Sequence, residues 1–147
     1  MYSIPHAATG LLITITVYTL TQNETLAYAI GMPLAIISHY FLDFLFEKGM
    51  SKKEQALFEG APTIIYMILA IYSGHFWLMI CSLIAGNFFD WIDKKLYLTI
   101  FFPKKFKPTF YFHKHKKGIK FTLNQTKLAG IISTVIIIGM FIILRAI

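Results

Sequence analysis

Several long apolar runs constrain this sequence more than any other feature. A helix needs about 20 predominantly apolar residues to cross the hydrocarbon core of a bilayer, and several runs of the chain approach that length. Of the 147 residues, 56% are hydrophobic and only 14% are charged, which is too little charge to cover the surface of a soluble domain. We therefore predict an integral membrane protein of the all-α class, folded as a single helical bundle within the lipid bilayer.

The sequence predicts about five transmembrane helices, at residues 5–20, 25–46, 61–73, 76–92 and 128–147. Pro33 lies inside the second span and is expected to kink it. The third span is short, so we expect it to be tilted or to begin earlier, between Gln55 and Phe58. The start of the chain has neither a basic segment nor a small-residue cleavage site, so no signal peptide is expected.

Lysine and arginine predict the orientation of these spans, because cytoplasmic loops carry the excess of basic residues. Three lysines lie between the second and third spans, and ten lie in the basic loop at residues 94–127. The other two connections contain none. We expect the N-terminus and both basic loops inside, the C-terminus outside, and a prokaryotic plasma membrane as the location.

The basic loop at residues 94–127 interleaves lysines with aromatic rings. Next to spanning helices, such a segment is expected to lie on the inner leaflet, with its lysines on anionic lipid headgroups. We therefore expect the lipid bilayer as the main partner and no nucleic acid. The sequence leaves a homo-oligomer open.

Histidines and carboxylates lie within or near the ends of the apolar runs, where ionisable groups are costly and require a partner, a proton path or a metal. Alternating spans put His6, at the start of the first span, and His39 with Asp43, late in the second, on the same inner side. His39 and Asp43 are four residues apart, so they share one helix face. With this spacing, one helix can offer two ligands to one metal ion.

Further candidates lie on the same predicted side. Asp90 and Asp93 are three residues apart at the end of the fourth span, so they share a helix face, while two histidines lie in the basic loop. Mixed imidazole and carboxylate ligands suit Zn²⁺, Mn²⁺ or Fe²⁺, and we expect a divalent transition metal, zinc by preference. Asp93 is the candidate catalytic residue, as a base, a further ligand or an orienter of a histidine. The expected metal ligands are His6, His39, Asp43, Asp90, His113 and His115.

A metal site at headgroup depth indicates hydrolysis of an ester bond. A bound metal can lower the pKa of a water molecule to about 7 and so make hydroxide available at neutral pH. The nearest esters at that depth are the headgroup linkages of phospholipids. The predicted function is a membrane-embedded metal-dependent hydrolase that acts at the cytoplasmic headgroup region, on phospholipid or other phosphoester bonds.

Short motifs of the chain match those of a known group. The first is a histidine before small residues, His6-Ala7-Ala8-Thr9-Gly10, and the second is a Ser-His-x-x-x-Asp helix formed by Ser38, His39 and Asp43. An Asp-rich helix end and a later histidine cluster complete the set, as Asp90 with Asp93 and His113 with His115. By these motifs the chain resembles the small membrane-bound metal-dependent hydrolases, whose relatives suggest similarity to zinc-dependent phospholipase C-like enzymes. The resemblance covers most of the chain and implies a zinc-dependent hydrolase.

Two non-enzymatic classes fit the same sequence. In the first, these groups bind an ion or conduct protons, although a transporter needs polar residues up to the outer face, where the first, third and fifth spans offer mainly Thr and Ser. In the second, a lipid-binding scaffold uses only the basic loop. The sequence leaves open whether the chain is an enzyme, and the metal content of purified protein with and without His39 and Asp43 separates these classes.

Overall fold

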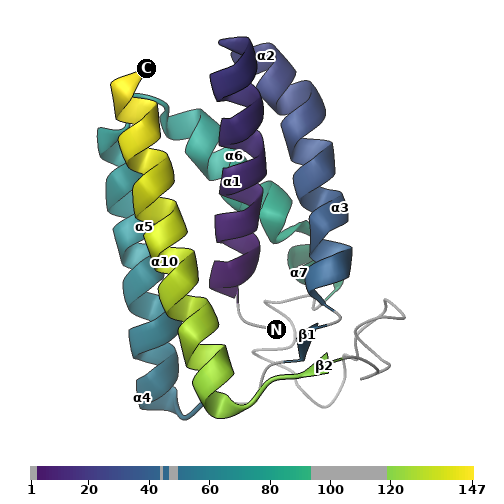
Figure 1. Ribbon diagram of the computed structural model, residues 1–147, viewed down its shortest axis with the longest axis vertical. Coiled ribbons are helices and arrows are strands. Elements are labelled where there is room, and N and C mark those ends of the chain that lie inside the picture. Colours follow the sequence, from purple (N-terminus) through teal and green to yellow (C-terminus); the bar gives the residue numbers. More distant parts are fainter. Residues whose placement is uncertain (1–2, 44, 47–49, 94–118) are drawn as a thin grey trace.

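A computed structural model describes residues 3–43, 45–46, 50–93 and 119–147, and nearly all of them are helical (Figure 1). The basic loop predicted at residues 94–127 therefore lies outside the described residues up to residue 118. In chain order the helical elements are α1 (Ser3–Thr21), α2 (Glu24–Leu26), η1 (Ala27–Gly31), α3 (Met32–Leu42), α4 (Lys52–Gln55), η2 (Ala56–Gly60), α5 (Ala61–Tyr72), α6 (Phe76–Gly86), α7 (Phe88–Asp93) and α10 (Leu123–Ala146). Two short strands, β1 (Leu45–Phe46) and β2 (Ile119–Lys120), pair in parallel.

The long helices run alternately up and down the bundle (Figure 1). Among the described residues, four helical stretches are long and apolar enough to cross a membrane: Ile4–Thr21, Glu24–Leu42, Lys52–Tyr72 and Leu123–Ala146. This finding confirms the predicted all-helical class and is consistent with a membrane protein. The alternation puts the start of α1, the end of α3, α7 and the start of α10 at one end, which we call the N-terminal end of the bundle.

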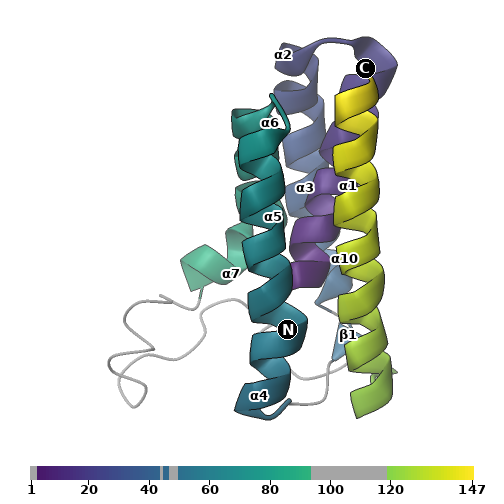
Figure 2. The same ribbon diagram turned by 90° about the vertical axis from the view of Figure 1, so that its left-hand side faces the viewer.

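The predicted fourth span is divided in the structure. The apolar helix α6 is shorter than a membrane-crossing helix, and the chain leaves helical geometry at Asn87 (φ −103°, ψ 11°) before α7 begins. Figure 2 shows α7 projecting sideways from the end of α6. The count of five transmembrane spans therefore stays a prediction.

Three helix ends differ from the predicted span boundaries. Helix α3 ends at Leu42, where Asp43 caps it, whereas the second span is predicted to residue 46. The helices of the third and fifth spans begin at Lys52 and Leu123, before the predicted starts at Gln55–Phe58 or residue 61 and at residue 128. Each of these helices starts with a capping box, in which a Ser or Thr and a Glu or Gln three residues later satisfy the free amides of the first turn. A prediction based on the length of the apolar run alone misses a helix start made of polar residues.

Prolines distort two of the long helices in the same way. The π-helical turn η1 lies just before Pro33, and η2 lies just before Pro62. A proline lacks the N–H and its ring clashes with the carbonyl four residues back, which disfavours regular α-helical bonding there. A π turn is a known accommodation of such a strained site. The irregularity expected at Pro33 is therefore present as a π turn.

Helix α1 forms the centre of the bundle and contacts α3, α6 and α10. Half of its apolar window is buried, against 17–22% in the other three helices of spanning length. Its approach to α6 requires glycine: a Cβ on Gly10 would lie 2.6 Å from the Ser82 carbonyl oxygen, and one on Gly86 would overlap the carbonyl oxygen of His6. These two glycines bring the backbone of α6 directly against the histidine-bearing turn of α1.

Candidate metal centre

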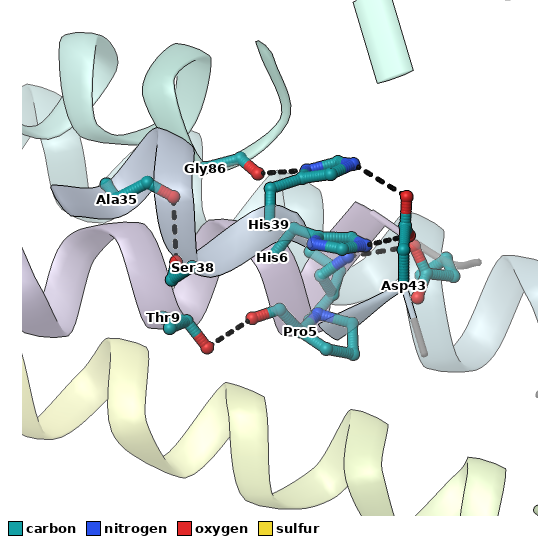
Figure 3. Close-up of polar contacts among 10 residues, drawn as sticks. Pro5, His6, Thr9, Ala35, Ser38, His39, Asp43 and Gly86 are labelled. Atoms are coloured by element: carbon teal, nitrogen blue, oxygen red, sulfur yellow. Dashed lines mark hydrogen bonds and ion pairs between the residues drawn. The ribbon is translucent and has the colours of Figure 1, made fainter. Parts of the chain in front are cut away.

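Three buried side chains from two helices meet at the N-terminal end of the bundle (Figure 3). His6 comes from the first turns of α1, His39 from the last turn of α3, and Asp43 from the residue that caps α3. The Nε2 atom of His6 lies 3.3 Å from Oδ1 of Asp43, and Nε2 of His39 lies 3.2 Å from Oδ2. Each residue offers a ligand atom, and these atoms lie within 4.8 Å of one another, a spacing that could hold a metal ion.

Burial makes this cluster unusual. Both histidine side chains are 0% exposed and the Asp43 side chain is 3% exposed. Taking a carboxylate out of water costs several kcal/mol unless opposite charge or hydrogen bonds compensate. A proton on one ring or a bound metal ion would each compensate the carboxylate of Asp43 between the two imidazoles.

The carbonyl group of Gly86 fixes the orientation of His39. It lies 2.7 Å from Nδ1 of the ring (Figure 3). A carbonyl oxygen only accepts hydrogen bonds, so Nδ1 donates and a neutral ring keeps its lone pair on Nε2. Metal-binding histidines are held in the same manner, with the second ring nitrogen bonded to a carbonyl or carboxylate. His39 is thus oriented as a ligand, with Nε2 directed at Asp43.

Each nitrogen–oxygen separation at Asp43, taken by itself, has the length expected between two ligand atoms of a tetrahedral ion. For metal–ligand bonds of about 2.0–2.1 Å, two ligand atoms on such an ion are about 3.3 Å apart. The two nitrogen–oxygen separations of 3.3 and 3.2 Å have this length. Without a cation, the lone pair of a neutral His39 ring would face a carboxylate oxygen at 3.2 Å and be repelled.

The two imidazole rings are stacked. Their centroids are 3.9 Å apart and their planes differ by 17°. Two imidazolium cations at this distance repel strongly, so the stacking favours at least one neutral ring, the form that binds a metal. Because the rings are nearly parallel, each faces its own oxygen of Asp43. A single shared ion would require them to tilt toward each other, and the broad χ2 torsion of histidine allows such a tilt.

Asp90 lies near this cluster but outside the group of three. It is buried on α7, with 5% exposure. Phe89 packs edge-on against His39, with ring centroids 5.7 Å apart, which places α7 beside the site. The structure thus brings His6, His39 and Asp43 together and puts Asp90 next to them.

The remaining predicted residues cannot be placed. His113 and His115 lie outside the described residues, and of Asp93 only the helical backbone of α7 is described. Ser38, part of the Ser-His-x-x-x-Asp motif, donates a hydrogen bond to the Ala35 carbonyl of its own helix (Figure 3). In this arrangement its hydroxyl satisfies the helix backbone.

Two contributors to the site were missed by the sequence analysis. The Gly86 carbonyl orients His39, and the carboxylate of Glu59 accepts a hydrogen bond from the backbone N–H of Ile4 at 3.2 Å. The second contact ties the first turn of α1, which carries His6, to η2. The first contact is made by a backbone carbonyl, which leaves no side-chain signal in the sequence. Nothing in the local sequence paired Glu59 with a residue 55 positions away.

No protein-family model, curated protein or solved structure matches this chain. The function of the site therefore rests on its own residues, and the resemblance to membrane-bound metal-dependent hydrolases stays a prediction.

Proposed function

We propose that the chain is a membrane-embedded metal-dependent hydrolase that acts on phospholipid or other phosphoester bonds at the cytoplasmic headgroup region. The observation that supports this proposal is the buried group of His6, His39 and Asp43, with ligand-like distances and an oriented His39 ring. The one-sided distribution of lysines supports the cytoplasmic location.

The composition of the group favours a catalytic over a structural metal. Structural zinc sites are usually closed by four ligands that include cysteines, whereas catalytic sites keep three protein ligands and an open position. Two imidazoles and one carboxylate, without sulfur, correspond to the catalytic kind. The same ligand set also suits Fe²⁺, so zinc is our first choice of metal and iron or manganese the next.

Different residues of the chain would bind the metal, orient a ligand and accept a proton during hydrolysis. The metal, when bound, supplies a Lewis acid and a water molecule of lowered pKa. His6, His39 and Asp43 hold that metal at headgroup depth, and the Gly86 carbonyl keeps His39 in the ligating tautomer. The reaction forms a bond from the water oxygen to phosphorus and breaks the ester P–O bond. We assign to Asp93, the last residue of α7, acceptance of the proton lost by the water and its transfer to the leaving alkoxide oxygen.

Ion transport is the less favoured function. A transport path needs hydrogen-bonding groups that face one another through the bundle. The buried hydroxyls of Thr14 and Ser82 instead donate to carbonyls of their own helices, at Gly10 and Leu78. These bonds satisfy the hydroxyls locally, as apolar helix packing requires.

Elemental analysis of protein purified without chelators tests the proposal. We expect bound transition metal in the wild type and its loss in His39→Ala and Asp43→Ala. His75→Ala is the matched control, because His75 also contacts a carboxylate but at the other end of the bundle. A wild type without metal would refute the proposal.

A turnover assay separates a hydrolase from a metal-binding protein. The metal-loaded wild type is incubated with vesicles of phosphatidylglycerol and phosphatidylethanolamine, and released phosphate and headgroups are measured. We expect release by the wild type and none by Asp43→Ala. Stoichiometric metal without any turnover, on these lipids or on soluble phosphoesters, would favour ion binding instead.

A further inference from the structure

An apolar groove of about 370 Å³ lies between α1, the end of α3 and α10, and we call it the α1–α10 groove. Its size falls within the range of roughly 300–1,000 Å³ typical of small-ligand pockets. On the α10 side it extends from Gln125 to Ile136. In Figure 3, Pro5 and Thr9, which line the groove, lie between the imidazoles and α10.

The wall of the groove offers little hydrogen bonding to a ligand. The Thr9 hydroxyl donates to the Pro5 carbonyl and the Ser133 hydroxyl donates to the Ala129 carbonyl, both within their own helices. The side-chain oxygen of Gln125 accepts from the backbone N–H of Thr122 and caps α10. A sugar or a peptide would lose its hydrogen bonds to water against such a wall, whereas a hydrocarbon chain loses none.

The length of the groove matches one leaflet. Residues 125–136 of α10 rise by about 16 Å at 1.5 Å per residue. Half of the roughly 30 Å hydrocarbon core of a bilayer is about 15 Å. An acyl chain that enters at headgroup depth would therefore run along the groove and end near the bilayer midplane.

One end of the groove lies close to the candidate metal centre, although none of the three members of that centre lines the groove. Pro5 and Leu42 line it, and each is the sequence neighbour of a member of the centre, His6 and Asp43. The start of α10, where Gln125 lies, is also at the N-terminal end of the bundle (Figure 1). A lipid whose chain filled the groove would hold its headgroup beside the imidazoles and the carboxylate.

From this placement we infer that the α1–α10 groove binds one acyl chain of a phospholipid and so presents its headgroup ester to the metal centre. The inference rests on the proposed function, since it names the substrate of the same site as a lipid recognised by its chain. It implies that short-chain phosphoesters are poor substrates.

Photo-crosslinking tests the groove directly. The full-length protein is placed in vesicles of phosphatidylglycerol and phosphatidylethanolamine that contain a trace of phosphatidylglycerol with a diazirine on one palmitoyl chain. We expect crosslinks on residues 125–136. Ala129→Phe fills the groove and should lower the crosslinking yield on the groove-lining residues below that of the wild type. Val135→Phe is the matched control, because Val135 is 64% exposed on the outer face of the same helix.

A second variant guards against misfolding of Ala129→Phe. Ile132 is half exposed and also lines the groove, so Ile132→Trp narrows it from a position that tolerates a larger side chain. Unchanged crosslinking in both variants overturns the inference. Metal content is measured in the same samples. If the wild-type protein contains no metal but its crosslinking is lost when the groove is filled, the proposed hydrolase is refuted and the acyl-chain site is retained.

Discussion

Two groups of histidine and carboxylate side chains lie at opposite ends of this bundle, and they differ in exposure and in the number of histidines. At the N-terminal end, Asp43 lies between two histidines, and all three side chains are buried. At the other end, Nδ1 of His75 lies 2.9 Å from Oε1 of Glu24, with the side chains 22% and 47% exposed. The shorter contact is thus the more exposed one.

Burial, rather than distance, separates a candidate site from a surface contact. Water and salt screen the pair of His75 and Glu24, and exposed ion pairs contribute about 0–1 kcal/mol. At the buried cluster the carboxylate of Asp43 is 3% exposed, so bulk water screens its contacts with the two histidines far less. The number of histidines also separates the two groups. One histidine and one carboxylate offer two ligand atoms, whereas the buried group offers three, as catalytic metal sites do.

Removal of the buried carboxylate should give the largest effect. Asp43→Asn keeps the shape of the side chain but removes the charge that faces both imidazoles. We expect loss of bound metal and a decrease of about 3–5 kcal/mol in the free energy of unfolding, the usual cost of breaking a buried pair. Elemental analysis and unfolding in detergent measure the two quantities. Metal retained at the wild-type level in Asp43→Asn would contradict the assignment of this residue as a ligand.

The next largest effect is expected where α6 meets the site. In Gly86→Ala the new Cβ would overlap the carbonyl oxygen of His6, so α6 must move and with it the carbonyl that orients His39. Overpacking of this kind costs about 1–3 kcal/mol, and metal affinity should fall together with the unfolding temperature.

Gly139→Ala on α10 is the control for this substitution. Nothing described lies within 4 Å of a Cβ at that position, and alanine is the better helix former by about 0.5–1 kcal/mol. We expect Gly139→Ala to be neutral or stabilising. Equal unfolding temperatures for the two variants would mean that the close approach of α6 to α1 does not position the site.

Asp90 should have an intermediate effect. It is buried on α7 beside the cluster, but it lies outside the group of three candidate ligands. If Asp90 orients a metal ligand without binding the metal itself, Asp90→Asn should weaken metal binding by about 10–100-fold without abolishing it. Competition with a chromogenic chelator measures this change. Complete loss of the metal would instead make Asp90 a direct ligand, as the sequence predicts.

Much of the fold was predictable because apolar length and alternating helices leave few choices in a bilayer. That reasoning placed α1 and the helical rod that ends near His39 within a few residues. It placed the starts at Lys52 and Leu123 poorly, because polar capping boxes begin those helices outside the apolar stretch.

The site was predictable to the level of its helices. The four-residue spacing of His39 and Asp43 fixed their common face, and the alternation of the spans brought His6 to the same end. The Gly86 carbonyl could not be found in this way, because a backbone partner leaves no side-chain signal and depends on how closely two helices pack.

The smallest effect is expected at the exposed pair, and it sharpens the contrast most. His75→Ala or Glu24→Gln removes one partner of a screened contact that links the start of α2 to the turn before α6. We expect a change of about 0–1 kcal/mol in the free energy of unfolding, unchanged metal content and unchanged turnover. Because salt already screens the pair, the effect should shrink further at high ionic strength. A loss of metal in either variant would show that the two ends are coupled, and burial would then no longer explain which histidines form the site.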